Sequence, residues 1–183
     1  STERIYVQRA VYAAFMEKFL AASAAVSPGG ESGDYGPMIS REKAESVIAM
    51  AREAVAGGAR VLTPLRYENG VLYPIIVAEP PPDCRLMTDQ IFGPAVAVVP
   101  FGAEEEALRL AASRHGGLAA SVWTRDRERA ARAAAALDAG SISVNDAIRA
   151  VAAPTCRSGA WERAVSEDIT ARKASMNSPG RRR

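Results

Sequence analysis

Few side chains in this sequence could attack a carbonyl carbon or move a proton during a reaction. The two cysteines are Cys84 and Cys156, and the single histidine is His115. A cysteine becomes a strong nucleophile when a neighbouring base or positive charge favours its thiolate, and no motif sets His115 beside either thiol. We expect Cys84 to be a partly buried, inert thiol and His115 to be a solvated surface residue. We therefore assign no catalytic residue.

These residues do not form a metal pattern either. No Cys-x-x-Cys pair and no Cys/His spacing typical of zinc sites occurs, and two cysteines are too few for a disulfide framework. No glycine-rich loop of the kind that cradles phosphates is present. We predict no metal site.

Residues that could bind a ligand lie further along, at Gln90, Phe92, Gly93 and Pro94. Glycine gives room for a tight backbone path, and proline directs the chain into an extended strand. From these residues alone, two interpretations are equally supported. Either Gln90 and Phe92 contact a ligand, or Gln90 is a turn residue and Phe92 a core anchor. Both interpretations stay open at this point.

Asn145 is a further candidate, because it stands at the end of an expected strand over residues 141–144. Asparagine often caps such a turn, since its side chain bonds to nearby main-chain groups. A structural role is at least as well supported as a binding role.

Composition and charge narrow the class of protein. The chain has 183 residues, of which 48% are hydrophobic and 24% charged, which is ordinary for a globular protein with one core. No apolar run is long enough to span a membrane, and no signal peptide is recognisable. We expect a cytoplasmic protein. Residues 154–183 carry a net charge of +4 and the rest −2, but without a basic face on the body we expect no nucleic-acid partner.

The elements that position these residues alternate between strand and helix. Strands are predicted at residues 4–8, 60–63, 73–78, 95–100, 118–124 and 141–144. Helices are predicted over residues 11–26, from a cap at Ser40 to Gly57, over 104–114, and from a cap at Asp126 to about Leu137, with Gly140 as the stop. Alternation of this kind favours a three-layer α/β fold with a largely parallel sheet flanked by helices.

Five segments in order resemble the aldehyde dehydrogenase family, from Ser1 to about Asp146. They are STERIYVQRAVYAAFMEKF, DYGPMIS with GARVL, DCRLMTDQIFGPAVAVVPF, GLAASVWTRD and AGSISVND. The third resembles the family's cofactor-contact segment, usually written EEIFGPV. The resemblance implies an oxidoreductase that oxidises aldehydes with NAD or NADP.

In that family the second acidic residue of EEIFGP accepts hydrogen bonds from the nicotinamide ribose, and the phenylalanine packs beside the nicotinamide. The matching positions here are Gln90 and Phe92. A neutral amide is a weaker acceptor than a carboxylate by about 1 kcal/mol or more, so we expect a vestigial cofactor site. Asn145 matches a position near the family's substrate tunnel.

The resemblance also implies what this sequence lacks. By the family's spacing, the nucleophilic cysteine, the general-base glutamate, the oxyanion-hole asparagine and the dinucleotide-binding domain all lie ahead of Ser1. We expect a partial catalytic domain over residues 1–153 that binds no cofactor and oxidises nothing by itself. The expected partners are a second copy of the chain or a missing N-terminal half. The alternatives are a non-catalytic α/β interaction module and the complementing half of a split dehydrogenase.

The tail over residues 154–183 departs from the family pattern. Reading the encoding DNA one base back, with freely chosen third bases, can give PFGGVGASGFGR in place of this tail, which is a convincing family terminus. We predict a frameshift near Pro154 and a non-native, irregular basic tail beyond it, because such a segment was never selected to pack.

Overall fold

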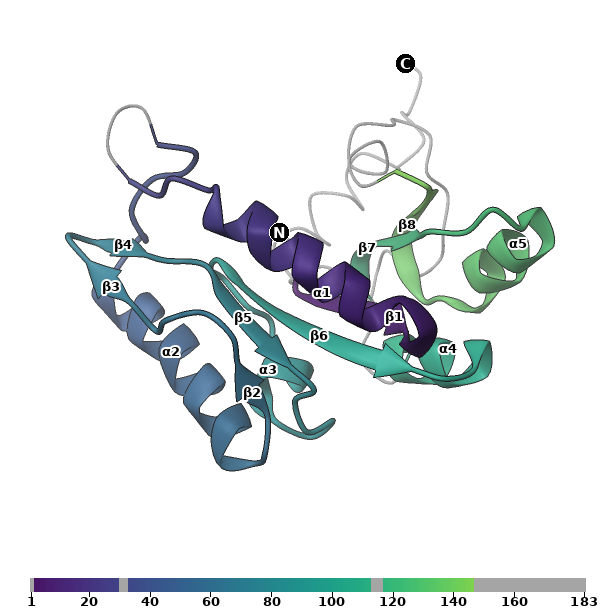
Figure 1. The fold of residues 1–183 in the computed structure, drawn as a ribbon, viewed down its shortest axis with the longest axis horizontal. Coiled ribbons are helices and arrows are strands. Elements are labelled where there is room, and N and C mark those ends of the chain that lie inside the picture. Colours follow the sequence, from purple (N-terminus) through teal and green to yellow (C-terminus); the bar gives the residue numbers. More distant parts are fainter. Residues whose placement is uncertain (1, 30–32, 113–116, 147–183) are drawn as a thin grey trace, which may run out of the picture. The chain divides into compact units, whose positions relative to one another are not determined.

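The computed structural model of the chain describes residues 2–29, 33–112 and 117–146 (Figure 1). They fall in two units, residues 1–107 and residues 108–183. His115, Cys156 and the predicted boundary between residues 153 and 154 lie outside the described residues, and so does the whole predicted tail.

A four-stranded sheet lies at the centre of the first unit. Its strands are β1 (Arg4–Gln8), β6 (Ala95–Phe101), β5 (Ile75–Ala78) and β2 (Arg60–Val61), in that spatial order. Both β1 and β5 run parallel to β6, with Arg4 opposite Ala97 and Ile75 opposite Ala95, while β2 is antiparallel to β5. Strand β6 is buried along Ala95–Val98 because it has neighbours on both sides and helices on both faces.

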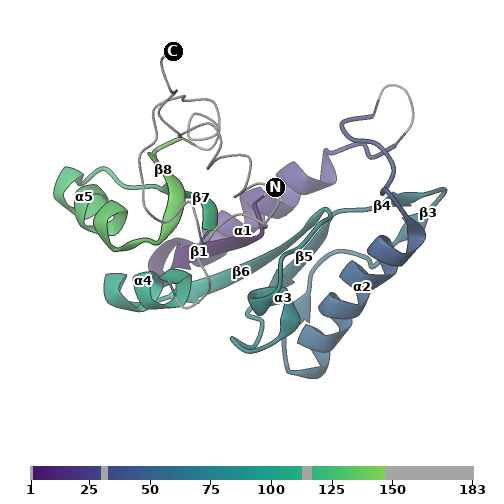
Figure 2. The same cartoon turned by 180° about the vertical axis from the view of Figure 1, so that it is seen from behind.

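Helices cover both faces of this sheet (Figures 1 and 2). On one face α1 (Arg9–Ala24) packs against the side chains of Ile76, Val96 and Val98. On the other face α2 (Arg41–Ala56) and the short α3 (Arg85–Thr88) pack against the alternate strand residues. The period-two alternation of a strand divides its residues between the two cores. The expected α/β class, with a largely parallel sheet between helices, is confirmed.

Local signals set the ends of these helices. The Ser40 hydroxyl accepts a hydrogen bond from the Lys43 N–H at 3.3 Å, so the predicted cap of α2 is present. The helix ends at Gly57, and Gly58 follows at φ +102°, where glycine is unstrained. A hairpin joins β3 (Tyr67–Glu68) to β4 (Val71–Leu72) through Asn69 and Gly70, both at positive φ as its twist requires.

The chain passes from the first unit to the second within α4 (Glu104–Ala112), whose first turn holds the expected acidic residues. The described part of the second unit contains β7 (Gly117–Val122), α5 (Arg127–Ala136) and β8 (Ala139–Val144), with the two strands parallel. The Asp126 carboxylate caps α5 by accepting from the N–H groups of Glu128 and Arg129.

One predicted stop signal is wrong. Gly140 was expected to stop α5, but it is the second residue of β8. The helix itself ends at Ala136, as predicted to within a residue, and Leu137 adopts an extended conformation at its C-cap. The strand-favouring run therefore begins before the glycine.

Candidate cofactor-contact site

Residues 88–94 leave α3 and enter β6, and they present two side chains to the outside. Ile91 is 3% exposed and anchors the segment in the core, whereas its neighbour Phe92 is 63% exposed. Gln90, on the other side of Ile91, is also exposed. Successive residues of an extended segment point in opposite directions, so the burial of Ile91 turns both neighbours outward. The core-anchor interpretation of Phe92 is therefore wrong, because Ile91 fills that role.

Gly93 lets this segment pass close to α2. A β-carbon at this position would lie 3.0 Å from Cγ2 of Val47 and 3.3 Å from Cε of Met38. The sequence predicted that the backbone needs room at Gly93. The structure shows the reason, because the chain passes close to α2 at this residue. Pro94 then accepts a hydrogen bond from the Ile75 N–H at 2.8 Å, and β6 begins at the next residue.

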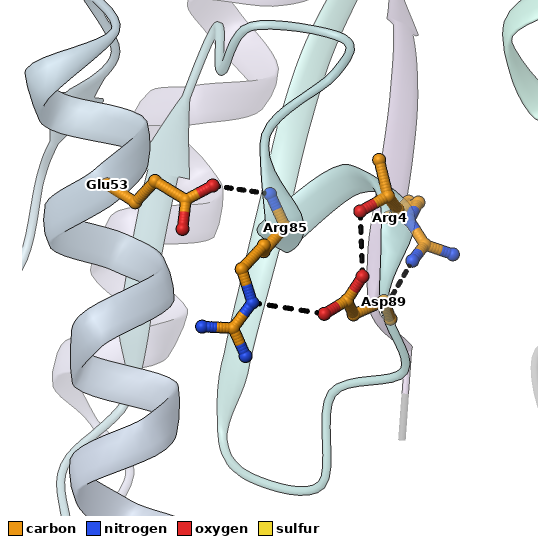
Figure 3. A network of polar contacts seen from close by, with 5 residues as sticks. Arg4, Glu53, Arg85 and Asp89 are labelled. Atoms are coloured by element: carbon orange, nitrogen blue, oxygen red, sulfur yellow. Dashed lines mark hydrogen bonds and ion pairs between the residues drawn. The ribbon is translucent and has the colours of Figure 1, made fainter.

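Charged side chains surround the start of the segment (Figure 3). The Asp89 carboxylate accepts from the Thr88 hydroxyl at 2.8 Å and from Nε of Arg85 at 3.1 Å. These hydrogen bonds, the Thr88 one first, lower the pKa of Asp89. The Arg85 N–H in turn donates to the Glu53 carboxylate of α2 at 3.0 Å. The segment is therefore tied to α3 and, through it, to α2.

Glu3, just before β1, and Arg4, the first residue of β1, also reach this segment. Oε1 of Glu3 accepts from the Ile91 N–H at 2.8 Å, and Nη2 of Arg4 donates to the Asp89 carbonyl at 2.6 Å. Sequence reasoning did not find Glu3 or Arg4. Their partners lie 88 and 85 residues further along the chain, and no local pattern signals so distant a contact.

The outer side of the segment carries an aromatic face with a cation nearby. The Lys43 ammonium lies 6.0 Å from the centroid of the Phe92 ring, at the outer limit of a cation–π contact. A planar ring and an amide on one exposed segment are groups that suit a heteroaromatic ligand with a polar attachment. The described residues at this site offer contact groups and no thiol.

Asn145 lies in the second unit, at the end of β8. Its Oδ1 accepts from the Thr124 N–H at 2.9 Å, and its Nδ2 donates to the Thr124 carbonyl at 2.8 Å. Its backbone has φ +54°, in the left-handed region that asparagine tolerates. Asn145 thus caps the turn, as the structural interpretation held. Its predicted place near a substrate tunnel stays a prediction.

Cys84 has the surroundings of a structural thiol. It is 7% exposed and belongs to the core cluster between the sheet and α2. Within the described ranges, no three His, Cys, Asp or Glu side chains gather where a metal ion could be held. Over the same ranges, no helix combines the length and the apolar character needed to cross a bilayer.

Comparison with known proteins gives a consistent family. Residues 1–161 match the family model described as Aldehyde dehydrogenase family. The chain is 35% identical over 152 residues to the 4,4'-diapolycopene aldehyde oxidase of a Methylomonas species, covering 82% of this chain and 29% of the relative. It is 36% identical over 157 residues to the 2-aminomuconic semialdehyde dehydrogenase of Mus musculus, covering 79% and 32%.

Solved structures agree with these relatives. Aldehyde dehydrogenase 21 from Physcomitrella patens, in complex with the reaction product succinate, matches with a TM-score of 0.77 and 29% identity over 82% of this chain and 32% of that chain. Betaine aldehyde dehydrogenase from Staphylococcus aureus, in complex with NAD+, matches with a TM-score of 0.73 and 26% identity over 79% and 31%. The chain therefore spans about a third of the length of the proteins it resembles.

Proposed function

This chain belongs to the aldehyde dehydrogenase family, whose members oxidise aldehydes to carboxylic acids, and from that premise we propose that it forms the cofactor-contacting part of such a catalytic domain. The proposal extends the family assignment to one segment, residues 88–94. Gln90 and Phe92 are its ligand-facing residues. The cofactor is NAD or NADP, which accepts the hydride that the aldehyde gives up.

The observation that carries this proposal is the outward presentation of Gln90 and Phe92 on either side of buried Ile91. Such an arrangement leaves the Phe92 ring free to pack beside a nicotinamide and the Gln90 amide free to bond ribose hydroxyls. A side chain 63% exposed has no core role that would explain a phenylalanine at this place. The segment is also held on a rigid base, as a contact surface requires.

We propose further that the 183 residues alone are catalytically silent. Cys84 is the one cysteine in the described part of the chain, and it is buried. Carbonyl attack needs an accessible thiolate, so we expect no turnover from Cys84. A partner, either a second copy or a separately encoded N-terminal half, and a cytoplasmic location belong to the same proposal.

A graft tests the cofactor contact directly. Residues 85–101 of this chain replace the matching segment in the Staphylococcus aureus betaine aldehyde dehydrogenase, and KM for NAD is measured with Gln90 and with Gln90→Glu. We expect Gln90→Glu to lower KM about fivefold, because a carboxylate is the stronger acceptor by about 1 kcal/mol. Phe92→Ala should raise KM. Unchanged KM for both variants would contradict the assignment.

The silence of the chain is tested separately. The purified 183-residue chain is mixed with an aldehyde and NAD, and NADH formation is followed by absorbance. We expect none above a blank, and Cys84→Ser serves as the control. NADH production that Cys84→Ser abolishes would show that this thiol reacts after all.

A further inference from the structure

We propose that Glu3 and Arg4 are positioning residues, which together fix the backbone of Gln90; we call them the Glu3–Arg4 clamp. The assignment deepens the proposed function and rests on it for its meaning, because Gln90 matters only if it faces a cofactor. The geometry of the clamp itself is independent of what binds there.

The two bonds of the clamp lie on either side of Gln90. Arg4 bonds the Asp89 carbonyl at 2.6 Å, and this carbonyl belongs to the peptide plane that precedes Gln90. Glu3 bonds the Ile91 N–H at 2.8 Å, and this N–H belongs to the peptide plane that follows Gln90. A residue has only two soft backbone dihedrals, and they relate these two planes. Holding both planes therefore fixes φ and ψ of Gln90 together.

The base of the clamp is rigid. The Glu3 carbonyl accepts from the Ala97 N–H at 2.9 Å, and Arg4 stands opposite Ala97 in the parallel pairing of β1 with β6. The two side chains are 21% and 22% exposed and lie 3.7 Å apart as an ion pair. Little solvent competes for their hydrogen bonds, and a charged partner makes each bond stronger than a neutral one.

The opposite side of the segment has its own support. Asp89 is held by the Thr88 hydroxyl and by Arg85 (Figure 3). Both residues lie before Gln90 in sequence. Those contacts hold the end of α3 but do not touch the peptide plane that follows Gln90. Glu3 supplies the bond on that side, so it is the residue whose loss should free Gln90 to rotate.

A clamp of this kind has a chemical purpose. Gln90 offers a neutral amide, whose bond to a ribose hydroxyl is weaker than that of a carboxylate. Fixing its backbone before the ligand arrives lowers the entropy lost on binding. We infer that the chain uses two charged residues to hold an uncharged contact in place.

The test uses the full 183-residue chain and does not require a cofactor. The exchange rate of the Ile91 amide hydrogen and the φ-dependent NMR coupling of Gln90 are measured in the wild type and in Glu3→Ala, Glu3→Gln and Arg4→Met. We expect Glu3→Ala to speed Ile91 exchange at least about tenfold, since the lost bond was charge-assisted. Glu3→Gln keeps an acceptor oxygen and should restore most of the protection.

Two further readouts separate positioning from plain destabilisation. The matched control is Glu45→Ala, which removes an exposed ion pair with Arg41 on α2 and should leave both measurements unchanged. Exchange at Val77 and Val98, in the sheet core, reports the global stability. A rise confined to Ile91, with an averaged Gln90 coupling, supports the clamp.

The opposing outcomes are distinct. Equal acceleration at Val77, Val98 and Ile91 in both Glu3→Ala and Glu3→Gln would overturn the positioning role, since the whole unit would then have loosened. Unchanged Ile91 exchange in Glu3→Ala would overturn it too. Neither result touches the proposed function, which falls instead if the graft shows no dependence of KM on Gln90 or Phe92.

Discussion

Asn145 stabilises the turn at the end of β8 by bonding to the main chain of Thr124. Both polar ends of its side chain bond Thr124, and its own N–H donates to the Val122 carbonyl at 2.8 Å. This single residue joins the ends of β7 and β8 and also occupies a positive φ. Its side chain and its backbone thus contribute to the same turn.

We expect Asn145→Ala to lower the free energy of unfolding of this unit by about 1–3 kcal/mol, from two lost hydrogen bonds and the cost of alanine at positive φ. Asn145→Gly keeps the backbone conformation and loses only the bonds, so it separates the two causes. Denaturation curves and the exchange rate of the Thr124 amide measure both. A Thr124 amide that exchanges at the wild-type rate in Asn145→Ala would contradict this account.

Asp89 makes the segment of residues 88–94 sensitive to acid. Its pKa is lowered by the Thr88 hydroxyl and then by Arg85, so folding favours the ionised form. The resulting stability is present above the unfolded pKa of about 3.9 and is lost as pH falls through the lower folded value. We expect unfolding below about pH 4 to be less steep in Asp89→Asn than in the wild type, measured as denaturation midpoint against pH. Parallel plots of denaturation midpoint against pH for the two proteins would contradict this role of Asp89.

At this scale the sequence suggested those residues of the candidate site that a local pattern encodes. Gln90 and Phe92 were proposed through the segment that resembles EEIFGPV, and the exposure of Phe92 follows from the burial of Ile91. Glu3 and Arg4 were missed because a hydrogen bond across more than 80 residues depends on which strands pair. No propensity or spacing contains that information.

Among the elements, helix ends were the most predictable, since caps are short-range chemistry. Ser40 and Asp126 cap α2 and α5 as expected. The short α3 and the β3–β4 hairpin strands were not predicted, because elements of two to four residues have no measurable periodicity. Gly140 misled because glycine is common after helices yet is also tolerated in strands.

The close contact between residues 88–94 and α2 gives a testable prediction about how the segment packs against the helix. We expect Gly93→Ala to destabilise the chain by about 1–3 kcal/mol, because the new methyl group would crowd Val47 and Met38. Gly36→Ala is the matched control, since nothing lies within 4 Å of its added carbon. Chemical denaturation measures both.

A double-mutant cycle identifies the cause. In a Val47→Ala background the added cost of Gly93→Ala should shrink, because the clashing branch is gone. If Gly93→Ala destabilises the wild type and the Val47→Ala variant equally, the strain does not come from Val47.

At the level of the whole molecule, the two units carry different spectroscopic reporters. All five tyrosines lie in residues 1–107, and both tryptophans, Trp123 and Trp161, lie in residues 108–183. The described core of the second unit consists of small residues, chiefly Ala130, Ala133 and Ala139. A two-stranded sheet over so small a core contributes little independent stability.

We therefore expect tryptophan fluorescence to change at lower denaturant concentration than the near-ultraviolet circular dichroism of the tyrosines. Trp161→Phe, which leaves Trp123 as the sole indole, is the control for the source of the signal. Coincident transitions by both probes would show that the chain unfolds as one cooperative unit.

We propose that the basic tail over residues 154–183 arises from a shifted reading frame near Pro154 in the gene. Sequencing that region should reveal an insertion or deletion relative to a frame encoding PFGGVGASGFGR. A chain with the restored frame should be more soluble, because a selected terminus would cover apolar surface. An uninterrupted frame whose third bases cannot encode that segment would refute the idea.

Five buried alanines of α2 and β6 belong to the core between that helix and the sheet. Ala44, Ala51 and Ala54 on the helix and Ala95 and Ala97 on β6 are each at most 3% exposed. Any single-base change in an alanine codon that alters the residue gives valine, serine, threonine, proline, aspartate, glutamate or glycine, and only glycine is smaller. A spontaneous mutation at one of these positions therefore places a larger side chain between α2 and the sheet far more often than it leaves a cavity there. Across generations, mutations that overpack this core are therefore a more frequent hazard to the fold than mutations that leave it underpacked.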